Sequence, residues 1–481
     1  MPLLSGMSMA YSQLATAVFG VFLASRLGAE DYGTVSLARN FFMIAVVLSP
    51  LGLDLALQRH LARASEASRA NEVAWLRLAA FTVSATVTAL LFTDLARLLE
   101  AHVFQHAGFG LVLAFTMAAL PLATDMAVLG GAYRGIYRPL LSVVTTYFIQ
   151  PTIRIVAILI LLSFISGLWA VVIGTLISFI LAWALQAARA HSLFPVGAGF
   201  LGARHEAAKV MRYALVLGVS TFIFTVARSL DTISLGYWAT LADVGRYAIV
   251  QMVGQLVAMI GIALGQTLAS SVAAAARDGD TALMATILKN NMSLASILCA
   301  PLCVAIAIWG RDIDLLLGPT YQITGSVFIV AALTQWLMTV THYSSVALSM
   351  TGRHMTELFN NLLALAVQLL ACALLVPYLG MLGAALATLS TILILTVIRQ
   401  IQIIRVVGIL LVDWKLLYPL LISAVVAAPF AYFGSMVAWR AWWLTGAVAG
   451  AHVTVSFIAV FLLVATTTQK RDLLARVRRR A

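Results

Sequence analysis

The chain has 481 residues, of which 62% are hydrophobic and only 10% are charged. Soluble domains use roughly half apolar and a quarter charged residues, so this composition excludes a water-soluble globular protein. A net charge of +12 would favour nucleic-acid binding in a soluble protein. In a membrane protein this net charge comes from Lys and Arg residues that lie next to the membrane. We therefore expect no nucleic-acid partner.

Apolar segments of roughly 20 residues, the length that crosses a bilayer, follow one another along the chain. The first six span 5–25, 34–55, 75–95, 109–133, 140–162 and 168–185. The next six span 211–237, 244–268, 288–309, 323–349, 355–376 and 381–398, and the last two span 416–433 and 443–464. The first segment is too long for a cleaved signal peptide. We therefore predict an all-α integral membrane protein with about 14 transmembrane helices.

The segments group as six, six and two. We predict an N-terminal six-helix lobe over 1–190, a cytoplasmic linker over 191–209 and a C-terminal six-helix lobe over 210–405. Two additional transmembrane helices follow over 406–467, and a basic cytoplasmic tail over 468–481. Of the 30 Lys and Arg residues, 22 lie in the even-numbered loops or the tail. This asymmetry predicts that both termini are cytoplasmic, with the tail on anionic membrane lipids.

The two six-helix halves show a faint internal repeat. The segment from Ala29 to Gly33 matches the segment from Leu241 to Gly245 at an offset of 212, and Gly167 matches Gly380 at an offset of 213. Short matches of this kind also arise by chance in apolar sequence. A repeat with an even number of helices keeps its topology, so it predicts a pseudo-two-fold axis along the membrane normal and a substrate between the lobes.

Three arginines lie inside expected helices, where a charged side chain needs a partner or a wet cavity. Arg39 lies close enough to a helix end to snorkel, and Asn40 stands beside it. Arg154 follows Pro151 and shares a helix face with Gln150, which predicts a kinked polar turn facing a cavity. Arg228 either pairs locally with Asp231 or joins the other two in binding one anionic group. Guanidinium suits a diphosphate or an acidic sugar.

Other membrane-embedded polar residues are candidates for ion coupling or for sugar binding. Asp54, Asp125 and Asp231 can serve proton or cation coupling, but pairing of Asp54 and Asp125 with Arg59, Arg134 or Arg138 explains them equally well. Gln251 and Gln255 share a helix face and can bind sugar hydroxyls or pack between helices. No motif predicts an enzyme, a cofactor or a metal site.

The stretch RLGAEDYGTVSLA at 26–38, followed by LGLDLALQRHLA at 51–62, resembles the opening of polysaccharide-transporter flippases, which include O-antigen and exopolysaccharide flippases. That family belongs to the multidrug/oligosaccharidyl-lipid/polysaccharide (MOP) exporter superfamily, whose MATE-like fold has two six-helix lobes. The resemblance implies a bacterial inner-membrane flippase. It would move an undecaprenyl-diphosphate-linked oligosaccharide from the cytoplasmic to the periplasmic leaflet by alternating access, for O-antigen (lipopolysaccharide) or exopolysaccharide biosynthesis.

The flippase hypothesis further implies coupling to a proton gradient, a sodium gradient or the membrane potential. Polysaccharide polymerase and glycosyltransferases are its expected protein partners. The alternative within the superfamily is a cation-coupled drug or metabolite antiporter, which needs acidic residues where this chain is basic. A membrane-embedded polymerase or glycosyltransferase is a third alternative, but the longest expected loop has only about twenty residues.

Overall fold

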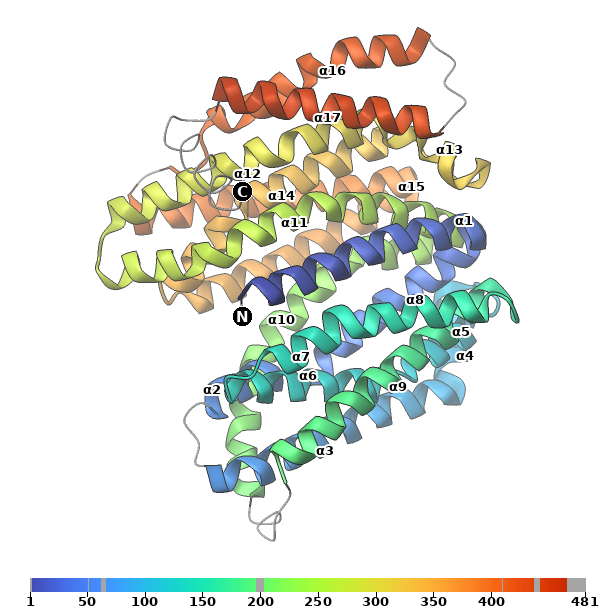
Figure 1. Cartoon of the computed structure of the whole chain (residues 1–481), viewed down its shortest axis with the longest axis vertical. Helices are drawn as coiled ribbons and strands as arrows, with labels where there is room; N and C mark the ends of the chain where they lie inside the picture. Colours follow the sequence, from blue (N-terminus) through green and yellow to red (C-terminus); the bar gives the residue numbers. More distant parts are fainter. Residues whose placement is uncertain are drawn as a thin grey trace. The chain divides into compact units, whose positions relative to one another are not determined.

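The structure is a computed structural model that describes residues 2–50, 52–61, 66–195, 203–408, 410–436 and 442–464. The predicted basic tail over 468–481 and part of the predicted linker lie outside the described residues. Within them the chain is helical, with no strand (Figure 1). It divides into two compact units, residues 1–245 and 246–481.

The first unit contains ten α-helices, three π-helical turns within the described residues, and the start of α11. They are α1 (Pro2–Leu48), α2 (Leu53–Leu61), α3 (Glu66–Leu90), η1 (Leu91–Leu95), α4 (Ala96–Leu98), η2 (Leu99–Phe104), α5 (Phe109–Met117), α6 (Leu120–Gly135), α7 (Leu140–Val144), η3 (Thr145–Ile149), α8 (Gln150–Leu161), α9 (Gly167–Leu193) and α10 (Arg204–Trp238).

The second unit holds most of α11 and the helices that follow it. The bounds are α11 (Leu241–Arg277), α12 (Thr281–Trp309), η4 (Gly310–Ile313), α13 (Asp314–Leu317), η5 (Pro319–Tyr321), α14 (Gly325–Met350), α15 (His354–Val407), η6 (Trp414–Leu417), α16 (Tyr418–Met436) and α17 (Trp442–Val464).

Twelve helical stretches in the described part of the chain are long and apolar enough to cross a membrane. Two of them, with 56 and 52 residues, are far longer than one crossing requires. Gly28 (φ 78°) interrupts α1 in the first stretch, and Gly380 (φ 53°) interrupts α15 in the second, each with non-helical dihedral angles. Glycine adopts positive φ without a steric penalty, so each long stretch bends into two crossings at this residue. The fourteen expected spans are therefore all accounted for.

One pair of glycines that the sequence repeat matches lies at corresponding helix junctions. Gly167 begins α9, the last expected crossing of the first half, and Gly380 begins the last expected crossing of the second half. The two glycines are the pair matched at an offset of 213. The glycines that the sequence repeats thus mark equivalent helix junctions.

The first unit is built around α6. This helix packs against α2, α3 and α9, and α1 packs against α10. A buried cluster that includes Leu57, Leu76, Leu129 and Tyr133 fills the space between these helices. The phenol of Tyr133 donates to the Gln186 carbonyl on α9 at 2.7 Å, so its one polar atom is satisfied inside the apolar cluster.

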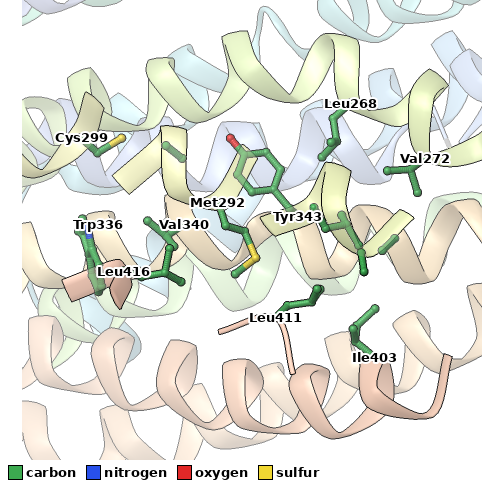
Figure 2. Close-up of a cluster of buried hydrophobic side chains, with 14 of the residues drawn as sticks. Leu268, Val272, Met292, Cys299, Trp336, Val340, Tyr343, Ile403, Leu411 and Leu416 are labelled. Carbon is green, nitrogen blue, oxygen red and sulfur yellow. The ribbon is translucent and has the colours of Figure 1, made fainter. Parts of the chain in front are cut away.

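The second unit is centred on α12, α14 and α15 (Figure 1). Figure 2 shows the main buried cluster, to which α11 contributes Leu268, α12 contributes Met292, and α14 contributes Trp336 and Tyr343. The Trp336 indole donates to Ser296 Oγ at 3.2 Å. The two C-terminal helices α16 and α17 pack on each other and on α12. They extend the second unit rather than forming a separate unit.

The boundary between the units differs from the expected lobe boundary. The seventh expected helix, which lies in α10, belongs to the first unit because it packs against α1, α2 and α3. The sequence grouped it with the lobe over 210–405, since it begins the second copy of the repeat. By its packing, α10 belongs to the first unit. By its place in the sequence repeat, it begins the second half.

Candidate functional site

A cationic cluster lies where α1 meets α8 in the first unit. The guanidinium groups of Arg39 and Arg154 repel each other, and both act electrostatically on the phenol of Tyr32. Arg154 Nη2 donates to Thr16 Oγ1 at 3.1 Å. Among the described residues no carboxylate contacts either guanidinium. Two of the three predicted arginines therefore act on each other electrostatically, and in the described part of the chain no carboxylate contacts them.

The backbone before Arg154 is irregular, as Pro151 predicted. Residues Thr145–Ile149 form a π-helical turn, and α8 begins at Gln150 with Pro151 as its second residue. Proline has no N–H to donate to the preceding turn, so the helix is widened at this point. Beside it, the hydroxyls of Tyr11 and Thr152 share a hydrogen bond of 2.8 Å, which adds polar atoms to the same α1–α8 contact.

The predicted neighbours of the arginines make local contacts. Gln150 is buried, and its Nε2 donates to Ser178 Oγ on α9 at 3.0 Å. Asn40 Nδ2 donates to the carbonyl of Ser36 in its own helix at 2.9 Å. Gln150 thus joins α8 to α9. Both remain predictions as substrate ligands.

Arg228 stands apart from the cluster. Its side chain is exposed, its Cζ lies 5.8 Å from the centre of the Phe224 ring, and Asp231 attracts it electrostatically. Asp231 is 4% exposed, and its Oδ1 accepts from the Thr232 amide at 2.6 Å. No contact in the described part of the chain joins Arg228 to Arg39 or Arg154.

The predicted amides Gln251 and Gln255 lie on α11 in the second unit, half-buried and exposed respectively. The stronger polar network of that unit lies elsewhere. Arg399 pairs with Glu357, and both side chains are 13% exposed. Glu357 also accepts from Ser345 Oγ at 2.6 Å and from Asn360 Nδ2 at 3.2 Å. Asn360 lies in an expected helix, but its half-buried partners are not evident from the sequence.

Asp125 has a partner that sequence reasoning missed. Arg77 on α3 donates to both Asp125 carboxylate oxygens at 2.7 Å, and the Trp183 indole on α9 donates to Oδ2 at 2.8 Å. The expected partners were Arg59, Arg134 or Arg138, because Arg77 was counted as a loop residue. The sequence signal for this partner was the position of Arg77 at the start of an apolar segment. This network ties three helices through one carboxylate that is 3% exposed.

Asp54 has one of its expected partners. Its Oδ2 lies 3.6 Å from Arg134 Nη2, and both side chains are about one-third exposed. Arg134 Nε also donates to Gln58 Oε1 at 3.2 Å. Asp54 therefore forms the expected ion pair at a helix end. Within the described residues, no group of three His, Cys, Asp or Glu side chains is arranged to hold a metal ion.

The comparison with protein-family models matched residues 3–269 to the family described as polysaccharide biosynthesis protein. This match covers more than half of the chain. The comparison with curated proteins found no match.

Solved structures of similar fold cover most of the chain. The lipid II flippase MurJ in an inward closed conformation has a TM-score of 0.75 at 12% identity, covering 98% of this chain and 100% of that one. An inward-facing multidrug resistance MATE family transporter of the MOP superfamily has a TM-score of 0.67 at 14% identity, covering 84% and 98%. A MOP superfamily transporter from Pyrococcus furiosus has a TM-score of 0.59 at 15% identity, covering 85% and 95%. These likenesses confirm the predicted fold class.

Proposed function

The chain belongs to the polysaccharide biosynthesis protein family, and from this premise we propose that it is a flippase for a lipid-linked oligosaccharide. The substrate would be an undecaprenyl-diphosphate-linked repeat unit, carried from the cytoplasmic to the periplasmic leaflet of a bacterial inner membrane. Both termini would lie in the cytoplasm. The lipid carrier follows from the resemblance described above, and the family description supports the link to polysaccharide.

The observation that carries the proposal is the Arg39–Arg154 cluster. Arg39 is exposed and Arg154 is half-buried, and two guanidinium groups that repel each other within a membrane span are stabilised when an anion joins them. A diphosphate offers several oxygens and more than one negative charge, and guanidinium donates to such groups in bidentate pairs. The hydroxyls of Tyr11 and Thr16 supply further polar atoms at the same contact of α1 with α8. The cluster suits the diphosphate better than a neutral sugar or a cation.

The antiporter alternative predicts an acidic residue available to an organic cation. Asp125 already accepts three hydrogen bonds from Arg77 and Trp183, and Asp54 lies beside Arg134. These contacts favour a structural role for both carboxylates. Coupling to a proton or sodium gradient, and association with a polymerase or glycosyltransferases, remain parts of the flippase proposal.

The test is deletion of the gene in its host, with complementation by wild-type protein and by Arg39→Ala and Arg154→Ala variants at matched membrane levels. We expect deletion to abolish surface polysaccharide and lipid-linked repeat units to accumulate. Each variant should restore less than about a tenth of export, since losing a charge-assisted bidentate contact costs about 1.5–3 kcal/mol.

The matched control is Arg97→Ala, which removes an exposed arginine of α4 in the same unit. It should complement fully. Full complementation by Arg39→Ala and Arg154→Ala would refute the cluster as the diphosphate site. Normal polysaccharide in the deletion strain, with sensitivity to organic cations instead, would favour the antiporter.

A further inference from the structure

The two C-terminal helices bury a row of polar side chains that make no hydrogen bond. Thr445, His452 and Ser456 lie on α17 at helical spacing, so they share one face of that helix. Ser423 belongs to α16, which packs against α17. The described part of the chain offers no hydrogen-bond partner to these three hydroxyls or to either nitrogen of the imidazole. His452, Ser423 and Ser456 are each 0% exposed.

Such a row is unfavourable in a membrane helix. A buried donor or acceptor without a partner costs free energy, and the imidazole leaves two such atoms in one ring. Hydroxyls in membrane helices commonly donate to the carbonyl four residues before them. Thr454 does so, and its Oγ1 donates to the Gly450 carbonyl at 2.8 Å. Ser456 on the same helix does not use this option. The row therefore has the capacity to bind a small polar species.

The surroundings of the imidazole combine an aromatic ring with oxygen atoms. The ring centres of His452 and Phe430 lie 5.7 Å apart, and the backbone of Ser423 faces the imidazole. Between these two residues of α16 stands Pro429, which has no N–H. The carbonyl of Val425 therefore lacks its helical donor. The stretch of α16 beside His452 thus carries hydroxyl and carbonyl oxygens that can accept hydrogen bonds.

His452 lies at the middle of its membrane span. Along α17 it is about 15 Å from Trp442 and about 18 Å from Val464, at 1.5 Å per residue. Thr445 lies about 10 Å away toward the side that the charge asymmetry predicts to be extracytoplasmic, and Ser456 about 6 Å toward the other side. The row therefore spans about half of the ~30 Å bilayer core, with a titratable ring inside it.

No carboxylate stands on the helices around this ring. Both α12 and α16 pack against α17. Apart from His452, the titratable residues of the three helices are Lys289, Cys299 and Cys303 on α12 and Tyr418 and Tyr432 on α16. A proton on the imidazole would therefore be stabilised by neutral oxygen atoms alone. Because no ion pair would hold it, such a proton could also leave again.

We propose that His452 is a proton-binding site through which the transporter is coupled to a proton gradient. A proton from hydronium in the extracytoplasmic water passes Thr445 and forms an N–H bond with the unprotonated imidazole nitrogen. Both ring nitrogens then donate, which suits the oxygens of Ser423 and Ser456. Histidine is the side chain that takes up a proton between about pH 5 and pH 8. The coupling role rests on the proposed function, whereas proton binding does not.

The test is nitrogen NMR of the purified full-length protein in lipid bilayers, with the ring nitrogens of its eight histidines labelled. The signal of His452 is the one that disappears in His452→Gln and stays in His342→Gln, a matched control in the membrane helix α14. A neutral ring gives two well-separated nitrogen signals, and a protonated ring gives two similar ones. We expect this change as the pH falls from about 8 to about 5. A ring that stays neutral would overturn the proposal.

The parent protein serves if His452→Gln does not fold. Magnetisation transfer from labelled phenylalanine rings then identifies His452, because in the described part of the chain it is the histidine whose ring contacts a phenylalanine. Ser423→Ala with Ser456→Ala removes two acceptors, so the proton should bind about tenfold more weakly. Thr454→Ala, which removes an exposed hydroxyl of α17, is the matched control and should change nothing. Equal affinities in the serine variant and this control would show that the row does not hold the proton.

Polysaccharide export in the complemented deletion strain tests the coupling role. Wild-type protein should export about threefold more at an external pH of about 6 than at about 8, because the inward proton gradient is steeper. His452→Gln should lose this dependence. An unchanged dependence in the variant would refute the coupling role. The NMR titration uses no polysaccharide, so it stands even if gene deletion shows another substrate. A neutral His452, in turn, leaves the flippase proposal to the Arg154 variants.

Discussion

The first unit contains two arginine sites with opposite surroundings. Arg77 donates to both oxygens of a buried carboxylate and ties α3 to α6. Arg154 has a threonine hydroxyl as its partner, and the charge of Arg39 repels it. Moving either guanidinium out of water costs desolvation free energy. Only Arg77 recovers that free energy by pairing with a carboxylate of the protein. The comparison separates an arginine that holds helices together from one that is free to hold an anion.

The second unit repeats only the first kind of site. Glu357 receives hydrogen bonds from Arg399, Ser345 and Asn360, and Asn360 exchanges two bonds of 2.8 Å with Gln402. This network links the two halves of α15 to each other and to α14. Within the described residues of the second unit, no pair of arginines without a carboxylate was found. Substrate charge is therefore expected to act mainly on the first unit.

The largest effect is expected from Asp125→Ala. It leaves Arg77 without its counter-charge and Trp183 without its acceptor, so the free energy of unfolding should fall by about 3 kcal/mol. Thermal unfolding of the purified protein in detergent measures this. The double variant Arg77→Met with Asp125→Leu should recover more than half of the loss. If the double variant is no more stable than Asp125→Ala, the loss does not come from the unpaired charge of Arg77 but from the lost acceptor of the Trp183 indole.

Glu357→Gln tests the network of the second unit. Glutamine still accepts from the Ser345 hydroxyl but no longer compensates Arg399, and we expect a loss of about 2 kcal/mol. Glu30→Gln, at an exposed position, is the matched control and should stay within about 0.5 kcal/mol of the parent protein. Equal stability of the two variants would mean that the polar network, not the ion pair, closes α15.

Asp54→Asn should have a smaller effect than either. Asp54 and Arg134 are each about one-third exposed and 3.6 Å apart, and exposed pairs contribute about 0–1 kcal/mol. The measured loss should also shrink when the salt concentration is raised, because exposed pairs are screened. A loss as large as that of Asp125→Ala would show that Asp54 has an additional role, such as ion coupling.

Most of the fold could be predicted from the sequence because membrane spans depend on local composition. The fourteen apolar segments, and the repeated glycines Gly167 and Gly380, are local signals that survive in the structure. The unit boundary did not follow from them, because whether α10 packs with α1 or with α11 depends on contacts between distant segments.

The candidate site was predictable only in part. Arg39 and Arg154 stand out because charge inside an apolar segment is rare. The partner of Asp125 was missed because Arg77 lies 48 residues away and its position at a helix start reads as a loop charge. Gln150 was expected to work with Arg154, yet a buried amide needs its own partner, and Ser178 provides it. Periodicity along one helix cannot show which neighbour an amide will meet.

The smallest effect on stability, and the most informative one, is expected from Arg154→Met. Methionine fills the volume of the arginine stem, removes a desolvated charge and ends the repulsion with Arg39, so stability should change by no more than about 0.5 kcal/mol or rise. Arg77→Met, the same substitution at the paired site, should instead cost about 3 kcal/mol because it leaves a buried carboxylate unpaired. Thermal unfolding of both variants, together with polysaccharide export in the complemented deletion strain, gives the two readouts. We expect Arg154→Met to be stable and inactive. If it is as unstable as Arg77→Met, Arg154 holds helices as Arg77 does, and the anion site must be sought elsewhere.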